Sequence, residues 1–307
     1  MIEMTGNVRL NYKYYSGEDL YTEGEIEQEL LEIVSNNSKE AFNSIILEKG
    51  SWSILYHLSE ARSNIIEGLP MAKEDHILEI GAGCGAITGK LAEKAGKVTC
   101  IELSKRRSLI NANRNKEYNN IEILVGNFED IEKDLKNDYD YITLIGVFEY
   151  AESYINKENA CEELLKMVMK HLKKGGKLVV AIENRLGLQY WAGAPEDHLG
   201  QYFVGLEGYP NTRGVRTFGK GEWVELLKSN GFNNYTFYYP YPDYKFPLMI
   251  YSDNHLPKRG ELMDNGRALS GERLHLFDEG RAFDALISNH LFTEFSNSFL
   301  IVVENEG

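Results

Sequence analysis

The stretch from His76 to Thr88 limits the fold of this chain more than any other. It reads HILEIGAGCGAIT, an apolar run that ends in three glycines at alternate positions, and a helical apolar pattern begins directly afterwards. Glycine allows a positive φ in the turn and lets backbone N–H groups approach a bound molecule closely. A second apolar strand, 98–101, ends at Glu102, about 20 residues past the glycines, where a carboxylate binds the ribose hydroxyls of an adenosine cofactor. We therefore predict a Rossmann-like nucleoside site.

The glycine loop alone leaves the nucleoside open. Gly81, Gly83 and Ala86 also fit the dinucleotide pattern G-x-G-x-x-A, so an NAD-dependent enzyme is an alternative. Such an enzyme needs a second mononucleotide half, and the sequence contains no second phosphate loop. The remaining motifs therefore have to identify the cofactor.

Composition excludes several classes of protein. The chain has 307 residues, of which 43% are hydrophobic and 26% charged, as in ordinary globular proteins. Its formal net charge of -14 argues against a nucleic-acid partner, because phosphate binding depends on clustered Lys and Arg. The three cysteines have no paired spacing, the first twenty residues lack an apolar signal core, and the apolar runs are too short to span a bilayer. We expect a cytoplasmic protein without a bound metal.

Strands and helices alternate through the middle of the chain, which predicts an α/β fold with a doubly wound parallel sheet. Further strands are expected at 121–125, 139–146, 178–182, 235–239 and 299–303. We expect the 158–173 helix to end at Lys174-Gly175-Gly176. The segment 240–247 contains three prolines and is not expected in a central strand.

The N-terminal part has a different pattern. Residues 1–22 are rich in tyrosine, including Tyr21, and are expected to form an arm, a lid or an interface segment. Two short helices are expected between 23 and 48, and one longer helix, capped by Ser51, through Ile66. We divide the chain into an arm with helices, 1–70, and a main domain, 71–307. The main domain contains substrate-side insertions at about 184–217 and 241–291, which form a substrate cap.

Several residues have both a functional and a structural interpretation. Asn127 and Phe128 follow the third strand, where an amide and a flat apolar face suit an adenine base, yet a Gly-Asn turn that starts a helix fits equally well. His57 and Arg62 lie on the helix before the glycine strand and are candidates for cofactor contact. The alternative is that both are satisfied core or surface groups.

Four features in order carry a family resemblance. Glu79 precedes the glycines, Asn127-Phe128 follows strand three, Gly146-Val147-Phe148-Glu149-Tyr150 follows strand four, and Lys174-Gly175-Gly176-Lys177-Leu178 leads into strand five. This series resembles the class I S-adenosylmethionine-dependent methyltransferases over roughly Ser51 to Val303. The resemblance implies a Rossmann-like sheet of seven strands whose last strand is antiparallel. It implies S-adenosyl-L-methionine as the cofactor.

By this resemblance the glycines lie under the methionine part of the cofactor, Glu102 binds the ribose and Asn127 and Phe128 bind the adenine. Glu79 would orient the loop or the amino group of the cofactor. Asn127 departs from the family pattern, where Asp is frequent, which should change the strength of the contact. The full set of expected cofactor-binding residues is Glu79, Gly81, Ala82, Gly83, Gly85, Glu102, Leu103, Asn127, Phe128, Gly146 and Arg62.

A looser similarity concerns the substrate side. The segments YHLS (56–59), ENRLG (183–187), GAPEDH (193–198), FYYPYPDY (237–244) and FSNSFL (295–300) look like bacterial methyltransferase domains found with glycosyltransferases in surface-polysaccharide biosynthesis. This similarity implies a small-molecule or glycan acceptor and association with glycosyltransferase machinery.

Methyl transfer is an in-line displacement at an activated carbon, so alignment and exclusion of water matter most, and no metal is required. For a hydroxyl acceptor a base helps. His198 beside Asp197 is the first candidate, since a histidine titrates near neutral pH, and Glu149 and Tyr150 are the next. A structural role for His198 is the alternative. The candidate substrate-binding residues are Asn184, Tyr190, Trp191, Tyr239, Tyr241 and Tyr244, and the alternative is that these aromatic residues belong to the core.

Other methyltransferase types lack their signatures here. Residues 146–150 contain neither the Asn/Asp-Pro-Pro-aromatic motif of nucleic-acid amino-methyltransferases nor the nucleophilic cysteine of pyrimidine carbon-5 enzymes. We predict O-methylation of a small molecule or glycan. A catalytically silent S-adenosylmethionine-binding partner module is the alternative. The acceptor, the methylated atom and the oligomeric state stay open.

Overall fold

The computed structural model describes residues 1–19, 22–155, 157–265 and 273–307. Tyr21 and part of the expected 241–291 insertion lie outside the described residues. The chain divides into two compact units, the first made of residues 1–144, 167–178 and 305–307 and the second of residues 145–166 and 179–304.

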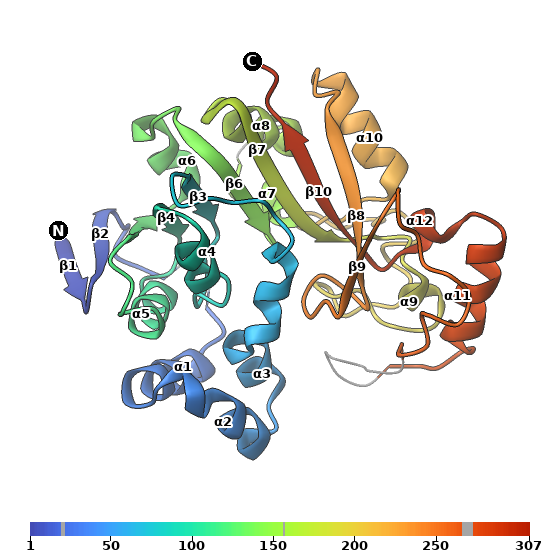
Figure 1. Cartoon of the computed structure of the whole chain (residues 1–307), viewed down its shortest axis with the longest axis horizontal. Helices are drawn as coiled ribbons and strands as arrows, with labels where there is room; N and C mark the ends of the chain where they lie inside the picture. Colours follow the sequence, from blue (N-terminus) through green and yellow to red (C-terminus); the bar gives the residue numbers. More distant parts are fainter. Residues whose placement is uncertain (20–21, 156, 266–272) are drawn as a thin grey trace. The chain divides into compact units, whose positions relative to one another are not determined.

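The strands of the first unit alternate with helices around the predicted glycine loop (Figure 1). Neighbouring strands pair in the order β1 (Ile2–Thr5), β2 (Val8–Tyr14), β5 (Ile121–Gly126), β4 (Lys97–Glu102), β3 (His76–Ile80) and β6 (Tyr139–Ile145). The pairs from β2 to β6 are parallel. In the sheet β3 lies between β4 and β6. The chain continues from β3 to β4 and β5 on one side and then returns to β6 on the other side, so the strand order reverses at β3. Ligands of such sheets bind beyond the carboxyl ends of the strands at this point.

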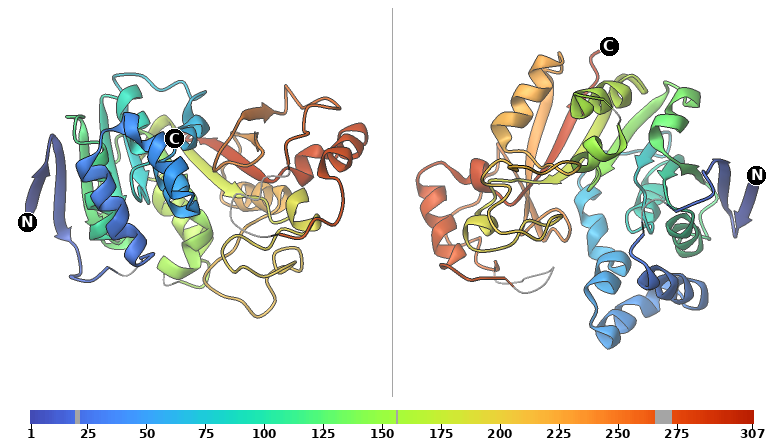
Figure 2. Two further views of the ribbon diagram at one scale, coloured as in Figure 1. Left: turned by 90° about the horizontal axis from the view of Figure 1, so that it is seen from below. Right: turned by 180° about the vertical axis from the view of Figure 1, so that it is seen from behind.

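Residues 2–14 form two strands that the sequence analysis did not predict. Strands β1 and β2 form an antiparallel pair, and β2 also pairs in parallel with β5, at one edge of the first unit in both views of Figure 2. The alternation in VRLNYKY explains this placement, since Val8 and Leu10 are fully buried while Arg9 is exposed.

Three N-terminal helices, α1 (Glu25–Asn36), α2 (Phe42–Lys49) and α3 (Trp52–Leu58), pack together, with the turn η1 (Lys39–Ala41) between the first two (Figure 1). Their shared core includes Leu30, Phe42 and Leu58, and it contacts Cys84 in the glycine loop. The expected single helix through Ile66 is wrong. Helix α3 ends at Leu58, and Ser59, whose Oγ accepts the N–H of Ala61, starts the 3-10 helix η2 (Glu60–Ile66).

The other helices of the first unit follow its strands: α4 (Thr88–Lys94), α5 (Lys105–Arg114), α6 (Phe128–Ile131) and the 3-10 helix η3 (Glu132–Asp134). The second unit contains η4 (Phe148–Tyr150), α7 (Ala151–Tyr154), most of α8 (Ala160–Met169), α9 (Leu188–Trp191), α10 (Lys220–Ser229), α11 (Glu279–Ser288) and α12 (Phe292–Phe295). None of the helices in the described ranges has the length and apolar character needed to cross a membrane.

The second unit contains the end of β7 (Leu172–Glu183), from residue 179, and the strands that follow pair in the order β7, β10 (Ser298–Glu304), β8 (Tyr235–Tyr241) and β9 (Met249–Ser252). The last strand of the chain, β10, is antiparallel to β8, and β8 is antiparallel to β9. The described residues therefore contain ten strands rather than the expected seven. Strands β1, β2 and β9 are the additional ones, and they lie outside the regions where the alternation of strands and helices was recognised.

Two expected strand boundaries are also wrong. Lys174-Gly175-Gly176 lies inside β7, because the backbone of Gly175 and Gly176 is hydrogen-bonded to that of Asn305 at 2.7 and 2.8 Å. Pro240 lies inside β8. It pairs there with Ile250 of β9, while the register with β10 ends at Tyr238, so the missing N–H of proline interrupts no pairing with β10.

We expect Leu58→Ala to lower the free energy of unfolding by about 2–5 kcal/mol, because Leu58 is fully buried in the core of the N-terminal helices. Leu47→Ala is the matched control, since the same atoms are removed from a side chain that is 84% exposed. Urea denaturation of both variants measures the difference, and equal losses would contradict this assignment of the core.

Candidate active site

The loop after β3 has the backbone geometry that its glycines predict. Gly81 and Gly83 have φ values of 73° and 53°, and the N–H of Gly81 donates to the carbonyl of Ile101 at the end of β4 (2.9 Å). A Cβ added to Gly83 would meet no atom of the described residues within 4 Å, so this position is open among them. A Cβ at Gly85 would lie 2.3 Å from Oδ1 of Asn111. Gly83 is therefore the glycine that leaves room for a ligand, whereas Gly85 permits close packing on α5.

Glu102 ends β4 and holds the glycine loop. Its carboxylate accepts the backbone N–H of Gly83 at 2.7 Å and that of Ser104 at 2.9 Å. The side chain is buried, and burial raises the pKa of Glu102. Each carboxylate oxygen has a second lone pair, so the group can accept hydroxyl protons of a bound ribose while it holds the loop.

Glu79 begins a buried chain of hydrogen bonds. Thr88 donates to Glu79 at 2.6 Å, Asn111 donates to Thr88 at 3.0 Å, and Asn115 donates to Asn111 at 2.9 Å and to the carbonyl of Gly85 at 3.3 Å. Burial raises the pKa of Glu79 to about 7. The chain ties the glycine loop to α4 and α5, which supports the predicted role of Glu79 in orienting the loop.

The two candidates on the N-terminal helices differ. His57 is buried beside Glu23, with Nε2 3.1 Å from a carboxylate oxygen, and Glu23 also pairs with Arg107 at 2.6 Å. His57 is thus a satisfied core group. Arg62 is also buried, with its guanidinium 3.7 Å from the ring centroid of Tyr56, but its Nε has no hydrogen-bond partner among the described residues.

At the end of β5, Asn127 caps α6, because its Oδ1 accepts the N–H of Glu129 at 3.3 Å. The alternative of a turn that starts a helix is therefore correct, and the predicted adenine contact stays a prediction. Phe128 and Ala82 are buried, while Leu103 is partly exposed. Gly146, with φ 67°, belongs to the second unit and packs against the hydroxyl of Tyr244.

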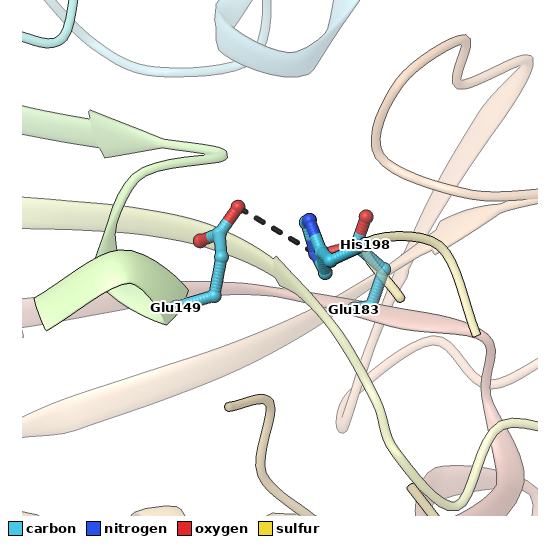
Figure 3. Close-up of side chains that lie close together, drawn as sticks. All are labelled: Glu149, Glu183 and His198. Atoms are coloured by element: carbon cyan, nitrogen blue, oxygen red, sulfur yellow. Dashed lines mark ion pairs between the residues drawn. The ribbon is translucent and has the colours of Figure 1, made fainter. Parts of the chain in front are cut away.

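In the second unit three buried side chains from separate elements converge, and we call them the acid–histidine cluster: Glu149, Glu183 and His198 (Figure 3). Glu149 comes from η4, Glu183 ends β7, and His198 lies in the loop of the GAPEDH segment. Nε2 of His198 is 3.5 Å from Oε2 of Glu183 and 3.9 Å from Oε1 of Glu149.

Neighbouring polar side chains form hydrogen bonds and ion pairs with the members of the cluster. Lys245 lies 2.5 Å from Oε1 of Glu183 and 2.9 Å from Oδ1 of Asp197, and Tyr244 also donates to Oε1 of Glu183, at 3.2 Å. The hydroxyl of Tyr150 is 3.0 Å from Nδ1 of His198.

The GAPEDH loop is itself held in place. Oε2 of Glu196 accepts the N–H groups of His198 and Leu199 at 2.8 and 2.7 Å. Tyr190 donates to Asp197 at 2.5 Å. Asp197 is engaged by Lys245 and Tyr190, and its predicted part in catalysis stays a prediction.

The proximity of these charges shifts their pKa values in different directions. Burial and then the charge of Glu183 raise the pKa of Glu149 to about 8. Burial alone would raise the pKa of Glu183, but Lys245 and then His198 outweigh it and hold the pKa far below its usual range. Burial lowers the pKa of His198, but the carboxylates of Glu183 and Glu149 outweigh burial and raise it to about 9. The cluster thus holds an ionised carboxylate beside a carboxyl that retains its proton more strongly.

The expected substrate-binding residues separate into two groups. Tyr190 and Tyr244 are buried next to the cluster through Asp197 and Glu183. The others form hydrogen bonds within the fold, and their contact with a substrate stays a prediction. Asn184 is fully buried, and its amide is hydrogen-bonded to three backbone groups. Tyr239 bonds to Asp253 and Lys220, Tyr241 accepts the N–H of Asp264, and Trp191, 45% exposed, donates to the carbonyl of Leu186.

Sequence reasoning missed four residues of these sites: Thr88, Asn111, Glu183 and Lys245. Glu183 is a carboxylate at the end of a strand that the sequence predicts to be buried, and such a position indicates a site residue. Lys245 lies 62 positions from Glu183 in the chain and carries no motif, so only the folded structure joins the two.

Comparison with known proteins identifies the class of the first site. A family model described as a methyltransferase domain matches residues 78–178, which contain the glycine loop and Glu102. Ribosomal RNA small subunit methyltransferase A of Clostridium acetobutylicum is 43% identical over 61 residues, 20% of this chain and 22% of that protein. The same enzyme of Ligilactobacillus salivarius is 38% identical over 61 residues, 20% and 21% of the two chains. The chain spans about a fifth of the length of these curated relatives.

Among solved structures, the fold is similar to that of a chain from a Haloferax volcanii complex, which contains the Trm112 methyltransferase activator and a methyltransferase. The TM-score is 0.50 and the identity is 14%, and the alignment covers 89% of this chain and 99% of that chain. A Haemonchus contortus phosphoethanolamine N-methyltransferase solved with S-adenosyl-L-methionine has a TM-score of 0.45 and 14% identity over 84% and 60% of the two chains. Residues 78–178 therefore match a methyltransferase domain, which is an enzyme domain, and the fold is Rossmann-like, as in the similar solved structure. The cofactor of this domain is S-adenosyl-L-methionine.

We expect Gly83→Ala to weaken binding of S-adenosylmethionine by at least tenfold, because its Cβ would occupy the open space beside the loop. Gly50→Ala is the matched control, with a φ of 58° and open space, so both variants carry the same backbone cost of roughly 1–2 kcal/mol. Calorimetric titration of the cofactor compares them. Unchanged affinity in Gly83→Ala would contradict a ligand at this loop.

We expect Glu79→Gln to become more stable relative to the natural protein as the pH rises from 5 to 8. The pKa of Glu79 is about 7 in the folded protein against 4.5 as the ordinary value, so its contribution to stability is fully present below pH 4.5 and is lost as the pH rises through 7. Gln cannot ionise and avoids this loss. The Tm difference between the two proteins, followed across this pH range, measures the effect.

Glu132→Gln is the control for this experiment. The pKa of Glu132 is lowered, since Lys170 and His171 outweigh the effect of burial, so the group is ionised in both states over this range. Its variant should show no corresponding gain at high pH. A flat Tm difference for Glu79→Gln would contradict a protonated Glu79 in the folded protein.

Proposed function

We propose that this protein transfers the methyl group of S-adenosylmethionine to a hydroxyl oxygen of a small-molecule or glycan acceptor. The observation that carries this proposal is the acid–histidine cluster, which adds buried proton-accepting groups to a chain that contains a methyltransferase domain. Attack by a hydroxyl oxygen releases a proton, and nearby acceptor atoms assist this step.

On the cofactor side, the proposal assigns the ribose hydroxyls to Glu102 and the methionine part to the loop around Gly83. The free Nε of buried Arg62 is a donor suited to the cofactor carboxylate, since an unpaired buried guanidinium nitrogen gains most from an anionic partner. Asn127 and Phe128 are assigned to the adenine, as the resemblance implies.

On the acceptor side, the proposal assigns the hydroxyl to the acid–histidine cluster. Oε2 of Glu149 and Nε2 of His198 have no hydrogen-bond partner among the described residues, so both are available to an outside hydroxyl group. Tyr150 and Lys245 hold their neighbours in place. In-line transfer then requires the acceptor oxygen to lie opposite the sulfonium, and exclusion of water by a closed site favours it.

Two other functions compete with this one. The curated relatives are named ribosomal RNA methyltransferases, but they match only about a fifth of their own length. The net charge of -14 disfavours an RNA surface. A catalytically silent cofactor-binding module is the second alternative. The sequence resemblance implies a glycan acceptor and work beside surface-polysaccharide glycosyltransferases, and the cysteines without paired spacing favour a cytoplasmic location. All three belong to the proposal.

Two variants test the proposal. We expect Glu102→Gln to weaken cofactor binding by about 10- to 100-fold, as expected for loss of a charged hydrogen-bond acceptor. We expect His198→Ala to retain cofactor affinity and to lose methyl transfer. Calorimetry with S-adenosylmethionine measures the first effect. Transfer of labelled methyl groups to hydroxyl-bearing saccharides, small metabolites and 16S ribosomal RNA measures the second.

The outcomes separate the three functions. Label in saccharides or small molecules supports the proposal, and label in RNA supports the alternative that the relatives' names suggest. Cofactor binding with no labelled product from any acceptor class supports the silent module. Tight binding that survives Glu102→Gln would show that the ribose assignment is wrong.

A further inference from the structure

The acid–histidine cluster has a property that a proton-accepting role alone does not require. Three of its polar atoms, Oε2 of Glu149, Oε2 of Glu183 and Nε2 of His198, lack a hydrogen-bond partner within the described parts of the chain. All three side chains are at least nine-tenths buried. Buried polar atoms are normally paired, so three unpaired atoms in one cluster of side chains indicate a missing partner. Figure 3 shows the two carboxyl groups and the imidazole turned toward one another.

The spacing of these atoms suits a metal ion. One ligand atom from each residue lies within 4.8 Å of the others, and the imidazole nitrogen is 3.5 and 3.9 Å from the two carboxylates. Ligands that lie about 2.1 Å from one tetrahedral metal ion are about 3.4 Å apart. The observed separations are longer than a good hydrogen bond and close to this value.

The surroundings orient each ligand as in metal sites. Lys245 and Tyr244 bind Oε1 of Glu183 and leave Oε2 to face His198. Tyr150 contacts Nδ1 of His198 and leaves Nε2 to face the carboxylates. In metal centres, partners of this kind fix the ring orientation and the free atom of each ligand.

The carboxyl groups in and around the cluster also outnumber the cationic groups beside them. Four buried or mostly buried carboxyl groups, of Glu149, Glu183, Asp197 and Asp243, lie around a single ammonium group, that of Lys245, and the imidazole of His198. Buried charges are stable when they are paired or bound to metal ions. A divalent cation at the open atoms would supply the positive charge that Lys245 does not.

We propose that Glu149, Glu183 and His198 bind a divalent transition-metal ion such as Mn²⁺ or Zn²⁺. Two oxygens and one imidazole nitrogen are donors that these ions accept, and three protein ligands leave positions open for an outside oxygen. All three ligands belong to the second unit, so the proposed metal site does not depend on the methyl transfer proposed above. Where that function holds, the open positions bind the acceptor hydroxyl and make its proton easier to remove.

The test uses the full chain after treatment with a chelator. We expect it to bind one equivalent of Mn²⁺ or Zn²⁺ in equilibrium dialysis, and Glu149→Gln and His198→Gln each to weaken the binding at least tenfold. Tyr150→Phe should weaken it about 10- to 100-fold with unchanged stoichiometry, as for other partners that orient metal ligands. Pulsed electron paramagnetic resonance of the Mn²⁺ protein should show coupling to an imidazole nitrogen, and this coupling should disappear in His198→Gln.

Glu132→Gln is the matched control, because Glu132 is a second buried carboxylate beside a histidine, His171, at 3.1 Å. It should bind the metal as the natural protein does, and thermal denaturation identifies variants that fail to fold. Lack of stoichiometric binding of either ion would overturn the proposal, as would equal affinity in Glu149→Gln and His198→Gln. Metal binding without methyl transfer to any acceptor would support the metal site and contradict the proposed function.

Discussion

The hydrogen bonds of the Glu102 carboxylate are the interaction on which the cofactor side of the molecule depends. They join the backbone of Gly83, in the loop after β3, to that of Ser104, which caps α5. A buried carboxylate needs such donors, and a loop with positive φ values at alternate residues needs an acceptor to hold its N–H groups. The same side chain therefore fixes the loop, ends β4 and places the start of the next helix.

The N-terminal helices also pack against the glycine loop and α5. Arg107 of α5 pairs with Glu27 at 2.7 Å and with Glu23 at 2.6 Å, so the helix that Ser104 starts also anchors α1. The core of α1–α3 contacts Cys84 inside the glycine loop. Because the loop is packed from both sides, its conformation is set before any ligand binds, which reduces the entropy cost of binding.

Local patterns predicted the parts of the fold that local physics determines. The strand, glycines and helix at 76–94 and the carboxylate at Glu102 follow from short-range periodicity and turn chemistry. Strand β2 was missed because its pairing with β5 joins residues more than a hundred positions apart, and β8 extends through Pro240 because its neighbour β10 has already ended. In the second site His198 and Glu149 were predicted individually, but their convergence with Glu183 and the charge of Lys245 depends on tertiary packing that the sequence pattern does not contain.

The chain itself provides a comparison that bears on why the second site exists. In the first unit Glu132 and His171 also form a buried acid–histidine pair, but Oε1 of Glu132 is bonded to His171 and Lys170, and Nδ1 of His171 lies 3.0 Å from the carbonyl of Lys136. The polar atoms of that pair are therefore bonded to each other and to neighbouring groups. In the cluster at His198, by contrast, three polar atoms lack a partner among the described residues, which lowers stability, although the fold provides satisfied alternatives elsewhere. A purely structural module gains nothing from this arrangement, whereas a site that binds and activates a ligand requires it.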